Sequence, residues 1–565
     1  MGRGGKPAAG AGTGIRVIWS DSVCDPTRAE INTPMDPTPP ASADPPAPRT
    51  DAWYDAAFWI LLAVGTAAKL AFLACGTLDL SFDEAYYWAW GRQPDWCYYS
   101  KGPGIMAVIW AGSAVAGDTT FGVRFAAVVC SVLTASIAYF FLRSFFAESR
   151  PALLAILLLG SAPLFAAGGV LSTIDAPFFL CWTAATAALW PAVSRGSLLG
   201  WVGVGLASAA GLQCKFTMAF FAAVVLIHVL WESPRLLRTP GPWVALAIAL
   251  ASLTPILIWN SRHEWITFLH TAEKGTTRED SWLTLRHLPE SFGAQFGAVS
   301  PVIFVGLAIS MWRCTADACG IDLGKPAGLD RTRARFLLAA AAPVAVFYSL
   351  LAFHRAIPAN WPVVAYLTPF AAAGWYWGKP WDGLQRSSFA WAIGLGLAMQ
   401  TAMAAASTDV LYHLGLPAGL RALGVPFEAR HDPTNRLRGY AELGAGLSRK
   451  AAALEARTGR PVFYLSDHYS YAAWAGFYGD RTRPAFAIPH ARPQNQFDIW
   501  RLEGRTPPIG GDALVIFEVD KGAADVRAMF ERVEPDPEDI VVLRGGFEIR
   551  RFGVWRAYGF RGFDP

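Results

Sequence analysis

The sequence predicts an all-α polytopic membrane protein with about eleven transmembrane helices, followed by a soluble α/β domain at its carboxyl end. Hydrophobic residues make up 53% of the 565 residues and charged residues only 16%, whereas a soluble domain carries about 25% charged residues. The mean hydropathy is +0.30. Many of the 24 Trp and 16 Tyr residues stand at the ends of apolar runs, where interfacial belts place them. Lipid is therefore the expected solvent for most of the chain.

Apolar runs of about 20 residues can cross a hydrocarbon core. The candidates are 57–77, 122–141, 151–170, 176–194, 198–213, 216–232, 242–260, 297–313, 336–353, 361–378 and 388–408. The run 104–117 has about fourteen residues, which is too short to span comfortably, and we expect it to lie at the interface.

The distribution of positive charge predicts the orientation of these spans. With a cytoplasmic amino terminus, the inside loops hold Arg143, Arg150, Arg195, Arg235, Arg238, Arg313, Lys325, Arg331, Arg333, Arg335, Lys379 and Arg386. The short outside loops hold fewer positive residues, which fits the positive-inside rule. Eleven crossings then leave the carboxyl terminus outside. We expect a multi-pass protein of the inner (plasma) membrane whose polar site is periplasmic.

Three regions follow from composition. Residues 1–50 are rich in Pro and Ala, cannot bury a core and are predicted to be disordered. Residues 55–408 hold the transmembrane domain. Residues 409–565 combine β-rich runs at Pro461–Leu465 and Ala513–Phe517 with an amphipathic stretch at Leu437–Arg457, which predicts an α/β domain on the outer side. A binding domain and a structural cap are equally plausible roles for it.

The eight Cys residues give no metal-binding pattern, because Cys314 and Cys319 are five apart and no His pair accompanies them. The sequence therefore predicts no metal site and no certain cofactor, and it leaves a divalent-metal requirement open.

Two adjacent carboxylates, Asp83 and Glu84, follow the first span among aromatic residues that include Tyr86 and Tyr87. A carboxylate in a partly apolar site can act as a general base or hold a cation. The alternative is an interfacial cap solvated by lipid headgroups.

Two lysines and one further carboxylate lie on the same predicted side. Lys101 stands before a Gly-Pro turn, where it suits a phosphate, although it could instead snorkel to headgroups. Lys215 lies where two apolar runs meet almost without a loop, so it needs an anionic partner. Asp175 precedes Pro177 by two residues and is expected to cap the next helix, a role that can coexist with function.

Two external segments carry the remaining candidates. Trp259–Trp265 contains Asn260 and His263, and His354–Pro362 contains Arg355 and Asn360. Either segment alone could be a loop anchor. All these polar residues gather on one face in the predicted topology, which suits an anionic lipid-linked substrate handled by a carboxylate base.

These motifs together resemble glycosyltransferase family 39, whose members have the GT-C membrane fold and include protein O-mannosyltransferases and the bacterial lipid A aminoarabinose transferase. The resemblance lies in Asp83-Glu84-Ala-Tyr-Tyr-Trp, Tyr98-Tyr99-Ser-Lys101-Gly-Pro, Gly117-Asp118-x-x-Phe121-Gly122-Val123-Arg124, Ser172-Thr-Ile-Asp175-Ala-Pro, Gly211-Leu-x-x-Lys215-Phe-Thr, Trp259-Asn260-x-x-His263-x-Trp265 and Asn360-Trp361-Pro362. It covers about residues 55–375 and, more weakly, Gln496-Phe497-Asp498-Ile499-Trp500. Family members usually have Lys-Pro-Pro or His-Pro-Pro where this chain has Lys101-Gly102-Pro103.

The resemblance implies an inverting enzyme that moves a sugar from a polyprenyl-phosphate carrier to a lipid, glycan or protein acceptor outside the cytoplasm. It implies Asp83 as the general base or acceptor-orienting carboxylate, with Glu84 beside it and Asp175 as the second functional acid. Lys101 and Lys215, helped by His354 or Arg355, would bind the donor phosphate. The residues that would shape the pocket are Tyr86, Tyr87, Asn260, His263 and Asn360.

Two other function classes compete with this interpretation. A flippase for a lipid-linked sugar would also need cationic residues, but near the bilayer midplane and often with internal repeats. A non-catalytic sugar-lipid binding subunit is the second rival. The expected partners are the lipid-linked sugar, its acceptor and membrane lipids, with no nucleic acid. The sequence does not identify the sugar or the acceptor.

Overall fold

A computed structural model of the chain describes residue 2 and residues 49–275, 284–323, 328–379, 383–517 and 524–563. The segment 1–50, predicted to be disordered, lies outside the described residues except for Gly2 and its last two residues. Residues Pro48–Pro565 form one compact unit, and this unit contains the fold and the site described below.

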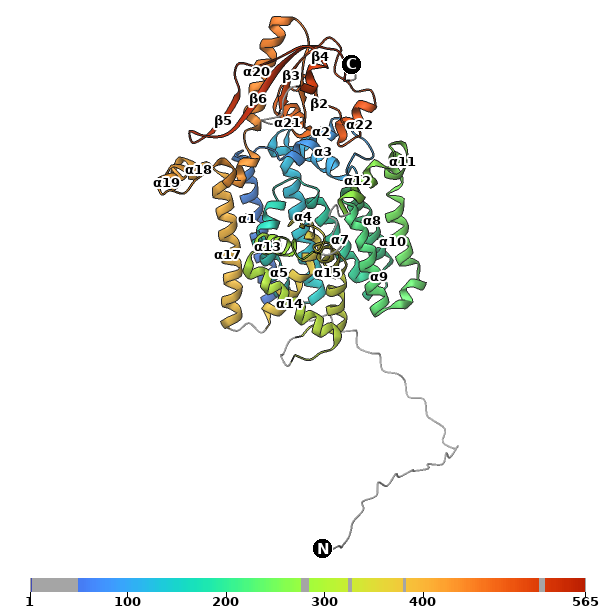
Figure 1. The fold of residues 1–565 in the computed structure, drawn as a ribbon. Coiled ribbons are helices and arrows are strands. Elements are labelled where there is room, and N and C mark those ends of the chain that lie inside the picture. Colours follow the sequence, from blue (N-terminus) through green and yellow to red (C-terminus); the bar gives the residue numbers. More distant parts are fainter. Residues whose placement is uncertain are drawn as a thin grey trace. The chain divides into compact units, whose positions relative to one another are not determined.

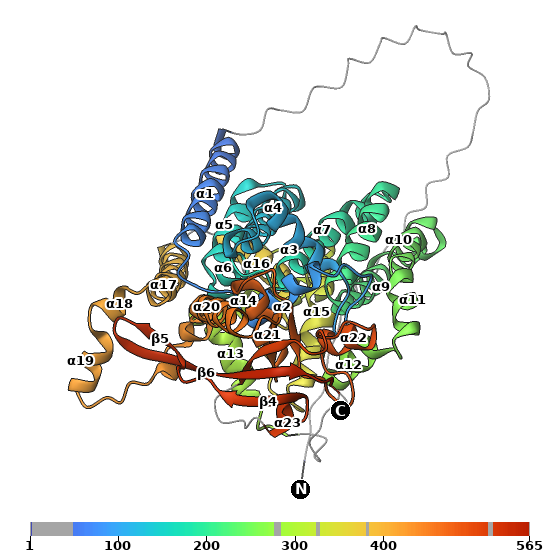
Figure 2. The same cartoon turned by 90° about the horizontal axis from the view of Figure 1, so that it is seen from above.

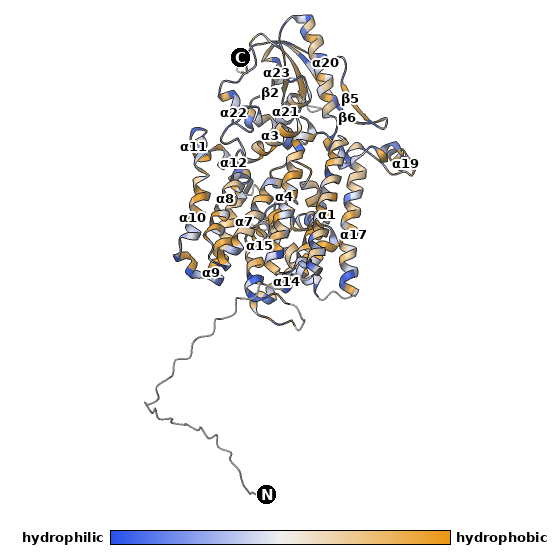
Figure 3. Ribbon diagram, turned by 180° about the vertical axis from the view of Figure 1, so that it is seen from behind, coloured by the Kyte–Doolittle hydropathy of each residue, from blue (hydrophilic) through white to orange (hydrophobic). Residues whose placement is uncertain are grey.

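Seven helical segments of the described chain are long and apolar enough to cross a membrane. They are α1 (Arg49–Ala74), α4 (Thr120–Phe146), α7 (Asp175–Ser194), α10 (Pro240–Ala251) continuing into α11 (Thr254–Arg262), α14 (Pro301–Cys319), α15 (Arg331–Leu351) and α17 (Gly383–Ser407). In Figure 3 hydrophobic residues cover the middle of these helices and hydrophilic residues their ends. The chain is thus mostly helical, and a multi-pass arrangement follows from seven such segments.

Shorter helices complete the bundle (Figure 1). They are α3 (Gly104–Ala116), α5 (Ser149–Ser161), α6 (Pro163–Gly168), α8 (Leu198–Cys214), η1 (Phe216–Ala219), α9 (Phe220–Glu232), η2 (Pro234–Arg238), α12 (Ile266–Gly275), α13 (Leu288–Val299), η3 (Val363–Tyr366) and α16 (Leu367–Gly378). Each predicted apolar run falls on helical residues, but several of the helices are shorter than a full span. The count of about eleven crossings therefore stays a prediction.

Ion pairs tie several helix termini together at one end of the bundle. Arg143 at the end of α4 pairs with Asp55 near the start of α1 at 2.9 Å. Arg335 at the start of α15 pairs with Glu232 at the end of α9 at 2.5 Å. Two of the positive residues that the sequence assigns to the cytoplasmic side, Arg143 and Arg335, therefore lie at this end.

The opposite end carries α2 (Phe82–Gly91), which follows α1 directly. Ser81 caps this helix: its hydroxyl accepts from the Glu84 backbone N–H at 3.3 Å, and the Glu84 carboxylate accepts from the Ser81 backbone N–H at 2.9 Å. This reciprocal capping box fixes where the helix begins. It therefore also fixes the position of the two carboxylates in its first turn.

The carboxyl-terminal region contains a six-stranded mixed sheet and its helices. Its elements are α18 (Val410–His413), α19 (Leu416–Ala422), η4 (Ala429–His431), η5 (Pro433–Leu437), α20 (Tyr440–Thr458), β1 (Val462–Ser466), α21 (Tyr469–Tyr478), β2 (Ala485–Ala487), α22 (Gln496–Leu502), β3 (Asp512–Phe517), α23 (Ala524–Arg527), β4 (Phe530–Pro535), β5 (Ile540–Arg544) and β6 (Phe547–Phe560). The strand order is β2-β1-β3-β6-β4, with β5 paired to β6. Strand β1 runs parallel to β2 and β3, whereas β6 is antiparallel to its neighbours. The predicted strands at 461–465 and 513–517 and the predicted helix at 437–457 are present within a few residues.

Helix α2 lies between the bundle and the carboxyl-terminal region (Figure 1), and its label lies next to that of α21 in the view from above (Figure 2). Its aromatic residues share one buried cluster with α3, α20, α21 and the sheet. Within this cluster the rings of Trp90 and Tyr98 stack with centroids 4.3 Å apart, and those of Tyr440 and Trp474 stack at 3.5 Å. Aromatic pairs of this kind contribute beyond their buried area, so α2 is held from both sides.

Candidate active site

Glu84 is completely buried and forms an ion pair with Arg124 of α4. The Arg124 guanidinium donates to the Glu84 carboxylate from Nε at 2.9 Å and from Nη2 at 2.8 Å. The backbone N–H of Ser172 also donates to it at 2.9 Å. Burial raises the pKa of Glu84, but the Arg124 guanidinium more than offsets this and holds the pKa below its ordinary value. Glu84 therefore joins α2, α4 and the segment before α7.

Asp175 is the centre of a second polar cluster. Lys215 Nζ donates to Asp175 Oδ1 at 2.8 Å, and Asn360 Nδ2 donates to Asp175 Oδ2 at 2.6 Å. The side chains of Lys215 and Asp175 are only 12% and 10% exposed. Three candidates that are far apart in sequence therefore meet at the start of α7.

The expected capping role of Asp175 is wrong. Asp175 is the first residue of α7, Ile174 stands at the N-cap position, and the Thr173 hydroxyl accepts from the Asp175 backbone N–H at 3.4 Å. The reason is that both carboxylate oxygens of Asp175 already accept hydrogen bonds from side chains, so its carboxylate serves the cluster.

Asp83 is half-buried in the first turn of α2, and Tyr87 follows one turn later. Burial raises the pKa of Tyr87 well above its ordinary value of 10, and the adjacent Asp83 carboxylate raises it further. The Asp175 carboxylate contributes in the same direction. Tyr87 is thus protonated at neutral pH, and both the Asp83 and the Asp175 carboxylates are near enough to affect it.

Lys101 lies beside the end of α8, the helix that leads into Lys215. A Cβ atom at Gly102 would lie 2.6 Å from the Gln213 carbonyl oxygen, and one at Gly104 would lie 2.6 Å from Cys214 Sγ. Both glycines are therefore needed for the close approach of the 101–104 turn to residues 213–214. Gly102, where family members usually have Pro, thus has a packing reason in this chain.

His354 and Arg355 lie in the turn after α15, a few residues before Asn360. His354 is half-buried, and its Nδ1 atom is buried without a hydrogen-bond partner among the described residues. The Arg355 guanidinium lies 5.0 Å from the centre of the Trp361 ring. The structure thus places both residues near Asn360 in the chain, but it gives no contact of either with Asp175 or Lys215 in the described part.

The other predicted pocket residues hold a loop and the carboxyl-terminal region in place. Asn260 is completely buried and donates to the Ile256 carbonyl at 3.0 Å. The His263 ring stacks on Trp259 at 3.8 Å, and its Nε2 atom lies 3.2 Å from Glu503 Oε1. Asn260 also donates to Cys97 Sγ at 3.5 Å, so these contacts tie the end of α11 to the loop that carries Lys101 and to the carboxyl-terminal region.

Tyr86 belongs to the same group of residues. Its hydroxyl accepts from the Gln496 backbone N–H at 2.5 Å, and the Gln496 side chain accepts from the Tyr99 backbone N–H at 2.7 Å. The 496–500 motif therefore anchors α22 to α2 and to the loop that carries Lys101.

Tyr469 is a residue of the candidate site that the sequence did not single out. It starts α21, its ring lies 4.5 Å from that of Tyr86, and the Asp83 carboxylate is among the groups that raise its pKa, after burial. No motif marks it, because it reaches the site from a distant part of the chain. It brings the carboxyl-terminal region next to Asp83.

Known proteins resemble this chain in sequence and in fold. The family model described as dolichyl-phosphate-mannose-protein mannosyltransferase matches residues 100–259. A lipid A galacturonosyltransferase from Rhizobium johnstonii is 26% identical over 335 residues, which cover 58% of this chain and 67% of the relative. The crystal structure of ArnT from Cupriavidus metallidurans bound to undecaprenyl phosphate superposes with a TM-score of 0.61 at 16% identity, covering 89% of this chain and 98% of that chain. The resemblance to glycosyltransferase family 39 is confirmed.

A further member of this group of relatives matches a shorter stretch. It is an undecaprenyl phosphate-alpha-4-amino-4-deoxy-L-arabinose arabinosyl transferase from Pseudomonas aeruginosa, 34% identical over 168 residues. The match covers 29% of this chain and 30% of the relative. The likeness to ArnT shows that the two chains share a fold, and its coverage of 89% of this chain extends over the carboxyl-terminal region as well as the helices.

Proposed function

We propose that this chain is an inverting glycosyltransferase that moves a sugar from a polyprenyl-phosphate donor to an acceptor at the non-cytoplasmic face of the inner membrane. The observation that carries the proposal is the polar cluster of Asp175, Lys215 and Asn360 beside Asp83 and Tyr87. Ionisable residues at membrane depth are costly and are kept for function. The named relatives act on lipid A or on an undecaprenyl-phosphate-linked sugar, which supports the same chemistry.

The donor phosphate would lie between Lys101 and Lys215. The turn with Lys101 packs against the two residues that precede Lys215, so the two lysine backbones are neighbours. A lysine binds phosphate as a point charge, and fixed cations stabilise the negative charge that grows on a leaving phosphate. Asp175 and Asn360 orient Lys215 and leave its other ammonium protons for the donor. His354 and Arg355 are proposed to assist from the turn before Asn360.

Asp83 is the proposed general base. It is the half-buried member of the acidic pair, so an acceptor can reach it. In the proposed step an acceptor oxygen or nitrogen attacks the anomeric carbon and gives its proton to Asp83. The bond between that carbon and the phosphate oxygen breaks, and its electron pair leaves with the lipid phosphate. One displacement of this kind inverts the anomeric centre.

Glu84, which the sequence placed beside Asp83 as a catalytic acid, is proposed to have a structural role. Its carboxylate accepts four hydrogen bonds, from Arg124, Ser81 and Ser172, and it is 0% exposed. A carboxylate that is buried and already paired has no access to an acceptor. Asn260, His263 and Tyr86 are proposed to shape the site through the loop and helix that they hold.

A largely apolar cavity of about 250 Å³ suits the polyprenyl chain of the donor. It lies between α13, α14 and α15 and reaches Ile357 and Pro362, on either side of Asn360. Residues such as Phe292, Leu307 and Met311 line it. An apolar cavity that ends next to a cationic cluster can hold an isoprenoid tail while its phosphate lies at the lysines.

The proposed orientation places the site and the carboxyl-terminal region outside. The ion pairs of Arg143 and Arg335 lie at the end of the bundle away from α2, and positive residues favour the cytoplasmic side. Eleven crossings and a division into residues 55–408 and 409–565 remain part of this proposal. In this proposal, the strand-containing region is a soluble domain that covers the site.

Replacement of Asp83 by Asn tests the proposal. The amide keeps the shape of the side chain but cannot accept the acceptor proton, so we expect transfer to fall by about a hundred-fold or more while the donor still binds. Transfer and donor binding would be measured on purified protein, with the lipid A of a deletion strain as one candidate acceptor. Glu442→Gln, an exposed carboxylate of α20, is the matched control and should change neither value.

The same variant separates the rival functions. A flippase or a non-catalytic binding subunit would not need a proton acceptor at position 83. Full activity of Asp83→Asn in the cell would therefore reject the proposal that the chain is a glycosyltransferase. Mass spectrometry of envelope lipids and glycans from the deletion strain would then name the sugar and its acceptor.

A further inference from the structure

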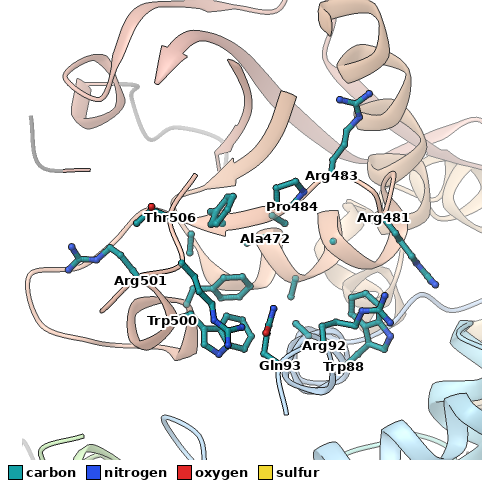
Figure 4. A pocket seen from close by; sticks show the side chains of 18 of the residues that line it. Trp88, Arg92, Gln93, Ala472, Arg481, Arg483, Pro484, Trp500, Arg501 and Thr506 are labelled. Atoms are coloured by element: carbon teal, nitrogen blue, oxygen red, sulfur yellow. The ribbon is translucent and has the colours of Figure 1, made fainter. Parts of the chain in front are cut away.

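A second cavity lies on the other side of α2, between this helix and the carboxyl-terminal region (Figure 4). Its volume is about 400 Å³, which lies in the range of small-molecule sites. The α2 side contributes Trp88, Arg92 and Gln93, and the opposite side comes from α21, β2, α22 and the turn after α22. The residues of the proposed transfer site do not line it.

Helix geometry separates this cavity from the proposed base. Asp83 and Tyr87 are four residues apart and share one side of α2, and so do Trp88 and Arg92. A step of five residues turns an α-helix by about 140°, so the two pairs face different directions. The cavity and the proposed base Asp83 therefore lie on different sides of α2.

On the α2 side, two arginines gather around Trp88 and share one carboxylate. Two guanidinium groups lie near the Trp88 ring, that of Arg92 at 5.2 Å and that of Arg481 at 5.3 Å from its centre. Trp88 Nε1 donates to Asp118 Oδ1 at 2.5 Å. The other Asp118 oxygen pairs with both guanidinium groups, that of Arg92 at 3.4 Å and that of Arg481 at 3.0 Å. Because one carboxylate pairs with two cations, each guanidinium keeps N–H donors that can bind a ligand.

Positive charge exceeds negative charge around the whole cavity. The lining includes Arg92, Arg481, Arg483, Arg501 and Arg505 and, in the described chain, no Asp or Glu. Arg483 is neutralised from outside by Glu455 and Asp480. Arg505 is exposed and has no side-chain partner within the described residues. A cavity of this kind attracts an anion, and arginine binds phosphate and carboxylate through paired donors.

Aromatic rings supply the other half of the lining. Phe486, Phe497, Trp500 and Phe563 border the same space. A flat apolar ring can pack against the C–H face of a sugar while the arginines bind its acidic group. A bare inorganic anion would gain nothing from these rings.

We propose that this cavity binds an acidic saccharide, a sugar that carries a phosphate or a carboxylate, as a part of the acceptor remote from the reacting group. The inference rests on the proposed function, because that function brings an acceptor to this end of the molecule. The sugar is either the headgroup of a membrane glycolipid or a free glycan, since both have the same chemistry. An acceptor bound here by its acidic sugar would lie along the helix that carries the proposed base, on a different side of it from Asp83.

The test measures sugar binding to the full chain in nanodiscs by isothermal titration calorimetry. The free-sugar probes are galactose 1-phosphate and galacturonate, and the lipid probe is phosphatidylcholine vesicles that contain lipid A. Galactose, inorganic phosphate and a polyglutamate peptide serve as comparisons. The variant is the double substitution R92Q/R505Q, which removes one cation from each side; Asp118 keeps Arg481 and Trp88 as partners. The matched control is R449Q, because Arg449 is exposed on α20 and does not line the cavity.

We expect the acidic sugars, the lipid A vesicles or both to bind the wild type and the R449Q variant, and to bind R92Q/R505Q at least about ten-fold more weakly, as the loss of charged hydrogen bonds predicts. Binding of the vesicles alone would identify a lipid headgroup, and binding of the free sugars a soluble glycan. Equal binding to R92Q/R505Q, binding of inorganic phosphate as tight as that of galactose 1-phosphate, or stronger binding of a polyglutamate peptide would overturn the inference.

Transfer is measured on the same proteins, so that the two proposals can fail separately. If the wild type binds acidic sugars but transfers none, the proposed function is wrong and the inference that the cavity binds an acidic sugar is kept. If the wild type transfers sugar and R92Q/R505Q binds and transfers as well as R449Q, the cavity inference alone is wrong.

Discussion

Asp83 and Glu84 are neighbours in sequence but have different surroundings. One residue turns an α-helix by about 100°, which points Glu84 into the protein toward Arg124 and leaves Asp83 beside Tyr87 at a half-buried position. The acid–base role that we propose therefore belongs to one of the two carboxylates. The other one holds α2 to α4.

Glu84→Gln tests this division at the level of stability. The substitution leaves Arg124, 2% exposed, as a buried charge without its anion, and breaking a buried pair costs about 3–5 kcal/mol. We expect a loss of this size in the free energy of unfolding, measured in detergent with a denaturant series. Asp83→Asn, by comparison, should stay within about 0.5 kcal/mol of the wild type. A Glu84→Gln protein as stable as the wild type would contradict the structural role.

The buried pair of Glu84 and Arg124 also makes the stability of the protein depend on pH. The pKa of folded Glu84 lies below its ordinary value of 4.5, so the pair contributes fully above that pH and its contribution is lost as pH falls through the lower folded value. Acid unfolding of the wild type should therefore show a component that is absent from Glu84→Gln.

At the scale of elements, the approach of the 101–104 turn to the end of α8 decides where the two lysines lie. Neither lysine is close to the other in sequence, and Gly102 and Gly104 allow the contact because a Cβ atom at either position would meet Gln213 or Cys214. The turn is therefore a positioning element of the proposed donor site.

Gly102→Ala should move Lys101 away from Lys215. The added Cβ would lie 2.6 Å from a backbone oxygen, which cannot move aside as a flexible side chain can. A misplacement of about 1 Å can cost about a hundred-fold in rate, and we expect a loss of this order in transfer together with weaker donor binding. Gly160→Ala, in α5 with open space around its Cβ position, is the control and should keep both. Wild-type transfer by Gly102→Ala would show that the turn does not position the phosphate site.

At the scale of the whole molecule, sidedness is the feature on which the proposed function depends. Two exposed cysteines lie on opposite ends of the bundle: Cys75 follows α1 near α2, and Cys319 ends α14. In the proposed orientation Cys75 is outside and Cys319 is in the cytoplasm.

A membrane-impermeant thiol reagent should therefore label Cys75, and not Cys319, in spheroplasts. Cys24 lies outside the described residues and would be replaced by Ser in all samples. Cys75→Ser should lose the label, and Cys319→Ser should keep it. Labelling of Cys319 from the outside would place the proposed active site in the cytoplasm and reject the orientation.

The sequence by itself determined that lipid surrounds most of the chain, where the helical runs and the strands at 461–465 and 513–517 lie, and that the chain resembles family 39. These features depend on local composition, periodicity and short motifs, which are read along the chain. The sequence also selected Asp83, Asp175, Lys101 and Lys215, because ionisable residues at membrane depth stand out against apolar neighbours. Asn360 came from the external segment His354–Pro362.

Only the tertiary structure decided which of these residues meet. It joined Asp175 to Lys215 and Asn360, paired Glu84 with Arg124, brought Tyr469 to Asp83, and connected Asn260 to Cys97 and His263 to Glu503. It also formed the arginine-lined cavity from α2 and a region almost four hundred residues away in sequence. The physical reason is that partner choice depends on packing between distant segments, and packing leaves no periodic or compositional mark on either segment alone.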